Sequence, residues 1–151
     1  ANTVFALGDL SERRDDLDEA KKYYEEALQI YTALEDQRNE ANTISALANI
    51  KKREGDLIGA EKDFREILTI YQNINSKVSE ANTLQALGEI RLRDKDLRKS
   101  EDYYTKALDI YEKLEEKQGM ANTLLAIGDV NYQHQSRKVV TRIRSTRKPA
   151  Q

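Results

Sequence analysis

The apolar and polar positions of this chain follow a pattern that repeats every 40 residues. Its clearest marker is the tripeptide Ala-Asn-Thr, which begins at positions 1, 41, 81 and 121. A period of roughly 20–50 residues indicates an array of small units that stack on one another. We therefore divide the chain into three full repeats (1–40, 41–80 and 81–120), the first helix of a fourth repeat acting as a cap (121–134), and a tail (135–151).

The apolar spacing predicts two helices in each repeat. In the first helix, repeat positions 4 and 7 are apolar in every copy and position 8 is small, which predicts one buried helical stripe that a neighbouring helix approaches closely. The residues are Val4, Leu7 and Gly8, then Ile44, Leu47 and Ala48, then Leu84, Leu87 and Gly88, and finally Leu124, Ile127 and Gly128. A polar break follows, and Asp16, Asp56 and Asp96 are placed to cap the second helix.

The second helix is longer and ends in a polar stretch at 35–39. Its apolar positions in the first repeat are Leu17, Ala20, Tyr24, Ala27, Leu28, Tyr31 and Leu34. These steps also follow helical spacing. One such helix pair is too thin to bury a core of its own, whereas stacked copies bury one between them. The pattern therefore predicts an all-α solenoid of antiparallel helix pairs.

These residues resemble tetratricopeptide repeats. Leu7-Gly8 in the first helix, with Ala20, Tyr24 and Ala27 in the second, fit that family's pattern. The common repeat has about 34 residues, and the 40-residue form is similar to repeats of Leu-Gly-Asn-rich polarity adaptors and of the sensor arrays of signalling NTPases. Ala48, Ile67 and Ser100 depart from the pattern as local repackings. The resemblance covers residues 1 to about 133 and implies a right-handed superhelix.

Charge and composition narrow the classes of function. The net charge is −2, yet residues 1–40 carry 5 basic and 11 acidic residues whereas 121–151 carry 6 and 1. No run approaches the roughly 18 apolar residues of a membrane helix, and no apolar signal segment precedes the first repeat. The chain contains no cysteine, which removes disulfides and thiolate sites. Together these features predict an intracellular, cytoplasmic protein.

No constellation of residues for catalysis or for a cofactor is recognisable. The single histidine, His134, excludes a multi-histidine metal cage and lies where the repeat breaks down, as a surface residue. There is no Gly-rich phosphate loop. The recurring Tyr23 and Tyr103 are interpreted as half-exposed packing between repeats, with a ligand-stacking platform as the alternative. We therefore expect no enzyme activity, no metal, no cofactor and no small-molecule substrate.

In tetratricopeptide arrays, first-helix positions 2, 5, 9, 12 and 13 line the concave groove, so the resemblance implies that they face a peptide ligand here. The candidate groove residues are Asn2, Phe5, Asp9, Arg13, Asn42, Ser45, Asn49, Arg53, Asn82, Gln85, Glu89, Arg93, Asn122, Leu125 and Asp129. Asn both donates and accepts hydrogen bonds, which suits a peptide backbone. The acids at position 9 favour a ligand with Lys or Arg and argue against an acidic ligand.

The residues at two of these repeat positions, 2 and 13, also have a structural interpretation that involves no ligand. Asn recurs at position 2 in every copy while its neighbours vary, which also fits a hydrogen bond between helices that holds the array together. The Arg residues at position 13 either bind ligand carboxylates or pair with the position-9 acids four residues away.

The tail breaks the repeat, because Arg137, Arg144 and Arg147 stand where the template requires apolar or aromatic residues. One interpretation is a solvated tail. Another is docking of Val139, Val140 and Ile143 on this array or a neighbouring one. We do not expect nucleic acid or acidic membrane as partners except through this tail, since no aromatic residue is interleaved to stack on bases.

The sequence therefore favours a non-catalytic module that binds a protein or peptide segment. The rival interpretation is an assembly role, as a spacer or sensor arm of a larger protein. Leu10 and nearby apolar positions of the first helix are expected to be exposed, and the acidic first end would then attract the basic last end of a second copy. Such head-to-tail contacts can propagate.

Overall fold

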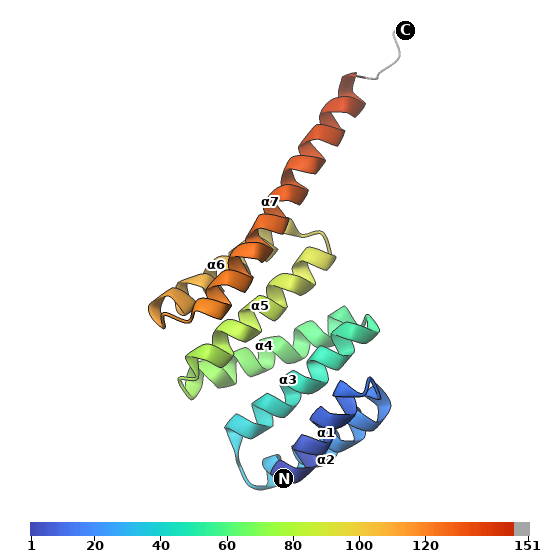
Figure 1. The fold of residues 1–151 in the computed structure, drawn as a ribbon, viewed down its shortest axis with the longest axis vertical. Helices are drawn as coiled ribbons and strands as arrows, with labels where there is room; N and C mark the ends of the chain where they lie inside the picture. The colour runs from blue at the N-terminus through green and yellow to red at the C-terminus, as the bar shows by residue number, and fades with distance from the viewer. Residues whose placement is uncertain (147–151) are drawn as a thin grey trace. The chain divides into compact units, whose positions relative to one another are not determined.

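The computed structural model describes the backbone of residues 1–146 and the side chains of residues 1–142. The described chain consists of seven α-helices and no strand (Figure 1). Their bounds are α1 Asn2–Arg13, α2 Leu17–Ala33, α3 Gln37–Glu54, α4 Leu57–Asn73, α5 Lys77–Arg93, α6 Leu97–Lys113 and α7 Lys117–Thr146. The all-α repeat solenoid expected from the apolar pattern is confirmed.

Every turn between helices has the same construction. A residue with positive φ occupies positions 15, 35, 55, 75, 95 and 115, a spacing of 20 residues, and only Gly55 among them is a glycine. The next residue donates its amide to a carbonyl five residues back, as Asp16 does to Ser11 and Asp36 to Tyr31, each at 3.0 Å. This is the Schellman helix stop. It lets the next helix begin after a turn of two or three residues.

In most of the turns, the residue that closes the stop also caps the following helix. The side chains of Asp16, Asp36, Asp56 and Asp96 accept from the amide three residues on. The predicted caps of the second helices are thereby confirmed, but the sequence analysis missed the cap at Asp36. Helix α3 therefore begins at Gln37, inside the stretch interpreted as a polar connection, and α5 and α7 begin at the equivalent residues.

The core of each repeat forms where a ring from the second helix lies on a small residue of the first. Tyr24 and Tyr104 are 0% and 4% exposed. A methyl group added to Gly8 or Gly88 would lie 2.6 or 2.8 Å from the ring of Tyr24 or Tyr104. Repeat 2 has the equally buried Ala48 and Phe64 at these positions. The predicted close approach at position 8 is therefore present.

The predicted burial of positions 4 and 7 is wrong for two of the three full repeats. Leu84 and Leu87 are buried, but Ile44 and Leu47 are half-buried and Leu7 is 39% exposed. The fully buried apolar residue of the first helix is instead at position 10, where Ile50, Ile90 and Val130 are all inaccessible. Ile50 packs against Ala20 and Tyr24 of the preceding repeat. Stacking between repeats buries this side of the helix, so a pattern judged within one repeat does not reveal it.

The second helices follow the prediction more closely. Positions 20, 24, 27 and 31 are buried in all three repeats. Leu34 is 65% exposed because it lies beyond the last residue of α2. Leu10 is 45% exposed, as expected for a first helix with no preceding repeat beside it.

The chain divides into two compact units, one from Ala1 to Thr83 and one from Leu84 onward. In the first unit α1 packs on α2, α2 on α3, and α3 on α4. In the second, α6 packs on α7, where Leu97, Tyr104 and Val130 form a buried cluster.

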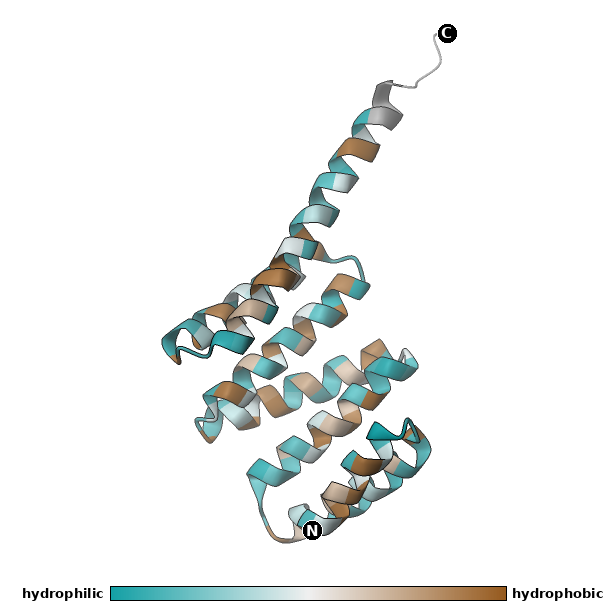
Figure 2. Ribbon diagram, viewed as in Figure 1, coloured by the Kyte–Doolittle hydropathy of each residue, from teal (hydrophilic) through white to brown (hydrophobic). Residues whose placement is uncertain are grey.

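Helix α7 continues through the boundary that the sequence analysis placed between cap and tail. Residues 117–146 form a single 30-residue helix, with no turn at positions 134–136 (Figure 1). Val139 and Val140 are 57% and 47% exposed on it, so neither is docked on the described chain. Figure 2 shows hydrophobic residues on the part of α7 that extends past α6. Arg147 lies outside the described residues, as do the side chains of Ile143 and Arg144.

The glycines at position 8 provide a test of this packing. Gly88→Ala is expected to lower the free energy of unfolding by roughly 1–2 kcal/mol, because the added methyl overpacks the Tyr104 ring. Gly128→Ala is expected to raise it by about 1 kcal/mol through helix propensity, because a methyl there meets nothing within 4 Å. Urea unfolding followed by circular dichroism measures both changes. Equal effects of the two substitutions would contradict this account.

Candidate functional site

The candidate groove residues lie on one side of the first helices, which we call the polar face: repeat positions 2, 5, 9, 12 and 13. On an α-helix these positions point away from positions 4, 7 and 11. The residues of α1 and α3 belong to the first unit, together with Asn82, whereas Gln85, Glu89, Arg93 and the α7 residues belong to the second. The geometry of each row decides which side chains remain available to a ligand.

The asparagines at position 2 bond to tyrosines of the second helix. Tyr31 donates its hydroxyl to the Asn2 side-chain oxygen at 2.8 Å, and Tyr71 donates to Asn42 at the same distance. These bonds are the inter-helix contacts that the structural alternative required. Because one lone pair of the oxygen is already used, such an asparagine offers a ligand mainly its amide NH2, a donor for peptide carbonyls.

The second unit builds the same contact with a different residue. Tyr111 donates to the side-chain oxygen of Gln85 at 2.9 Å, and the Gln85 amide donates to the Thr123 hydroxyl at 2.7 Å. The contact links α5, α6 and α7 through three side chains. Gln85 was predicted to face a peptide ligand, and its side chain joins consecutive repeats.

The acids at position 9 are tied to the core tyrosine at position 24. Tyr24 lies within hydrogen-bond distance of Asp9 at 2.7 Å and Glu12 at 3.0 Å. Burial, followed by these carboxylates, raises the pKa of the Tyr24 hydroxyl far above its usual range. In repeat 2 the ring is Phe64, which has no hydroxyl, and position 9 is the neutral Asn49. In the three full repeats, the acid and the hydroxyl are therefore present or absent together.

The remaining acids of this row differ in their surroundings. Glu89 accepts from Arg93 at 2.8 Å, the pairing of positions 9 and 13 that was the alternative for the arginine row. Asp129 lies exposed on α7. Asn122 accepts from Gln118 at 2.9 Å, and Leu125 is 72% exposed.

Arg53 connects two repeats. It donates to Asp15 at 2.6 Å and to Glu12 at 3.4 Å, both in repeat 1. This ion pair between repeats was not anticipated by either interpretation of the arginine row. Arg13 is exposed in the last turn of α1. Phe5 is half-buried, with its ring centroid 5.2 Å from that of Tyr24, so it contributes to the core.

A small pocket of about 150 Å³ opens on the polar face of the first unit. Its lining residues are Asn42, Ser45, Tyr71, Ser79, Asn82 and Thr83. Three of the candidate residues, Asn42, Ser45 and Asn82, are thus brought together, and every side chain around them carries a hydroxyl or an amide. The pocket can form hydrogen bonds to a peptide backbone but offers little apolar area.

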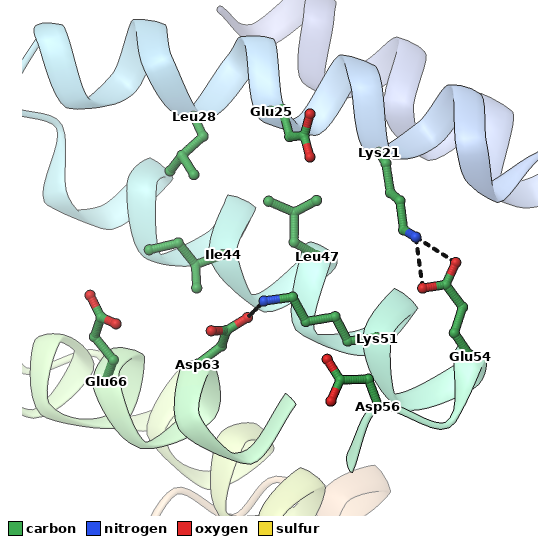
Figure 3. A pocket seen from close by; sticks show the side chains of 10 residues that line it. All are labelled: Lys21, Glu25, Leu28, Ile44, Leu47, Lys51, Glu54, Asp56, Asp63 and Glu66. Carbon is green, nitrogen blue, oxygen red and sulfur yellow. Dashed lines mark hydrogen bonds and ion pairs between the residues drawn. The ribbon is translucent and has the colours of Figure 1, made fainter. Parts of the chain in front are cut away.

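A second, larger cavity of about 540 Å³ lies on the other side of α3, and we call it the charged groove. Leu28, Ile44 and Leu47 form its apolar part, between α2 and α3 (Figure 3). Lys21 pairs with Glu54 at 2.5 Å and Lys51 pairs with Asp63 at 2.6 Å (Figure 3). Glu25 and Glu66 are exposed at its rim, and Asp56 caps α4.

The charged groove was not predicted, because the apolar pattern places Ile44 and Leu47 in the core. A signal was present in the chain, since the second helices before and after this apolar stripe carry acids at positions 25 and 66. Only the half-burial of positions 4 and 7 reveals that the stripe borders an opening.

Among the described residues, no group of three or more His, Asp or Glu side chains is placed to hold a metal ion. No helix in the described part of the chain has the length and apolarity needed to span a membrane. His134 is half-buried in α7.

The fold and these surfaces define an α-solenoid of 40-residue helix pairs. A family profile described as tetratricopeptide repeat matches residues 1–73, 39–113 and 79–139. The chain therefore belongs to the tetratricopeptide repeat family. Repeats of this family generally mediate interactions between proteins and do not carry out catalysis. No curated protein sequence matches the chain.

Solved structures share the fold at low identity. The chain is similar to BtubC from P. vanneervenii (24% identity, TM-score 0.76, covering 88% of this chain and 55% of that one). It is similar to the apo form of RapI (19% identity, TM-score 0.82, covering 90% of this chain and 50% of that one). It is also similar to the N-terminal domain of stress-induced protein-1 from C. elegans (10% identity, TM-score 0.62, covering 82% of this chain and 91% of that one). The chain spans about half the length of the first two.

The buried tyrosines predict how stability depends on pH. Burial raises the pKa of Tyr71, Tyr104 and Tyr111 to about 12, whereas an unfolded tyrosine titrates near about 10. The unfolded chain therefore loses these protons first, so stability is full below about pH 10 and falls as the pH rises toward 12. Urea unfolding at a series of alkaline pH values measures this fall. Stability that stays constant from pH 9 to pH 11 would contradict the burial of these hydroxyls.

Proposed function

We propose that the chain is a non-catalytic module that binds a protein segment bearing Lys or Arg on the polar face of its first helices. The observation that carries this proposal is the small polar pocket of the first unit, where Asn42, Ser45 and Asn82 meet. Their amides and hydroxyls provide partners for a ligand backbone. Asp9, which belongs to the same unit, provides a carboxylate for its basic side chains.

The contacts within the array determine which hydrogen-bonding groups remain for such a ligand. Asn42 offers its NH2 group, because its oxygen accepts from Tyr71. Asp9 already accepts from Tyr24, so it contributes a second lone pair and its charge. Binding would rest on several modest contacts, with a few anchors contributing most of the free energy. A cytoplasmic site of action is part of this proposal, because a chain without cysteine suits a reducing compartment.

The charged groove is a second candidate for the same class of ligand. It combines an apolar floor at Leu28, Ile44 and Leu47 with five carboxylates, of which Glu25 and Glu66 lie exposed at the rim. A helix with an apolar side and a basic edge fits this chemistry. The polar face remains our first choice, since an extended segment can bond to the amides at repeating positions along it.

A peptide-display selection separates these candidates. We expect the wild-type chain to enrich basic motifs from a random library. In an Asp9→Asn, Glu89→Gln, Asp129→Asn variant we expect that enrichment to be lost and the affinity for enriched peptides to fall at least about tenfold. These substitutions remove charge but keep acceptor oxygens, so the bond from Tyr24 is retained and the helices stay intact.

A matched variant, Glu25→Gln with Glu66→Gln, removes the same kind of charge from the charged groove. If this variant alone loses the motifs, the ligand binds in the charged groove. If no library enriches any motif, both candidates are rejected and the assembly role, as a spacer or sensor arm, gains support. Circular dichroism of each variant confirms that helicity is unchanged.

A further inference from the structure

The outward side of α7 carries an apolar stripe that nothing in the described chain covers. Leu125, Tyr132 and Val139 are 72%, 74% and 57% exposed and follow one another at seven-residue steps. The opposite side of the helix packs against Leu97 and Tyr104 through Val130. The stripe is therefore an unpartnered helix face in the second unit, and it includes the polar-face positions of Leu125 and Tyr132.

Two small residues and one polar residue alternate with the bulky ones along this stripe. Ala121, Gly128 and Gln135 lie three or four residues from them, which gives the 3-4 spacing of a two-helix seam. Gly128 is the informative member. Gly8 and Gly88 each lie under a tyrosine ring, whereas a methyl group added to Gly128 meets nothing within 4 Å. The same gap that receives a ring elsewhere in this molecule is open on α7.

We propose that a second copy of the chain covers this stripe, with the two α7 helices antiparallel and Tyr132 of each lying over Gly128 of the other. In this arrangement Val139 faces Ala121, and Leu125 faces Gln135. All three pairs are centred on position 130, so one register satisfies them together. A parallel pairing would place Tyr132 on Tyr132 and leave a void between two glycines.

The charges at the ends of α7 complement this register. No acidic residue follows Asp129, and Arg137, Lys138 and Arg142 are exposed. Position 142 of one copy lies level with position 118 of the other, beside the turn that carries Glu115 and Glu116. The basic end of each helix therefore arrives at the acidic α6–α7 turn of its counterpart. Both ends gain this attraction, because the pairing is symmetrical.

One residue opposes the pairing. Asp129 lies next to the two-fold axis in this register, so the two Asp129 carboxylates face each other. Like charges at such a position weaken association. Removal of this charge must therefore strengthen the dimer, a change opposite in direction to the loss of peptide binding expected on the polar face.

The interface is closed by its own symmetry. The seam from position 118 to 142 is about 37 Å long at the usual helical rise. An isologous contact of this kind stops at two copies, unlike the head-to-tail stacking considered from the sequence. Its partner is the same residues of the same helix, so no other segment of the chain is needed.

Sedimentation velocity on the full chain over about a hundredfold range of concentration tests the pairing. We expect a monomer–dimer equilibrium. Tyr132→Ala and Gly128→Leu should each weaken it at least about tenfold, and Asp129→Asn should strengthen it. Gly128→Leu leaves the monomer intact, because the added side chain has open space. A wild-type chain that stays monomeric throughout, or association that is unchanged in Gly128→Leu, overturns the proposal.

The orientation is tested separately with single cysteines, which the natural chain lacks. Asn131→Cys lies beside the proposed axis, so a short bifunctional thiol reagent should join two copies. In Gln135→Cys the two thiols lie about 15 Å apart along the helix axis, and the same reagent should not join them. Cross-linking at 135 without cross-linking at 131 indicates parallel helices and overturns the antiparallel register.

Discussion

The approach of an aromatic ring to the backbone of the neighbouring helix sets the geometry of each repeat. Tyr24 and Tyr104 lie so close to Gly8 and Gly88 that a methyl group would not fit without displacement. The ring fixes the distance between the two helices of the pair. That distance leaves position 10 facing the previous repeat, where Ile50 and Val130 fill the space beside the same tyrosines. One contact therefore organises packing both within and between repeats.

The same tyrosines link the core to the surface that is proposed to bind ligands. Their hydroxyls reach the polar face, where Asp9 accepts from Tyr24, and Phe64 coincides with the loss of the acid at position 9. Tyr31 and Tyr71 do the same for the asparagines at position 2. Recurrence of a polar residue on this face thus has a structural cause, because a core tyrosine needs a hydrogen-bond partner there. The lone pairs and amide hydrogens left over determine what a ligand can use.

The fold was predictable because its determinants recur within each repeat. The 40-residue period, the small residue at position 8 and the apolar positions of the second helix correctly indicated stacked helix pairs. The prediction failed where burial depends on the neighbouring repeat. Leu7 and Leu87 occupy the same position, but one is 39% exposed and the other 1%. The charged groove was missed for the same reason, and so was the pairing of Arg53 with Asp15, which are 38 residues apart. The sequence pattern predicted a boundary between residues 134 and 135 because the side-chain repeat ends there, but the backbone of α7 remains helical through this point.

The turns recur with a shorter period than the pattern of side chains does. A left-handed residue recurs every 20 positions, so the backbone does not distinguish the first helix of a pair from the second. Only the side chains, with a period of 40, carry that distinction. Removal of one helix and one turn would leave every remaining turn intact, but it would exchange first helices for second ones throughout the rest of the chain. Changes in the length of such a chain are therefore compatible with its packing only when a whole helix pair of 40 residues is added or removed.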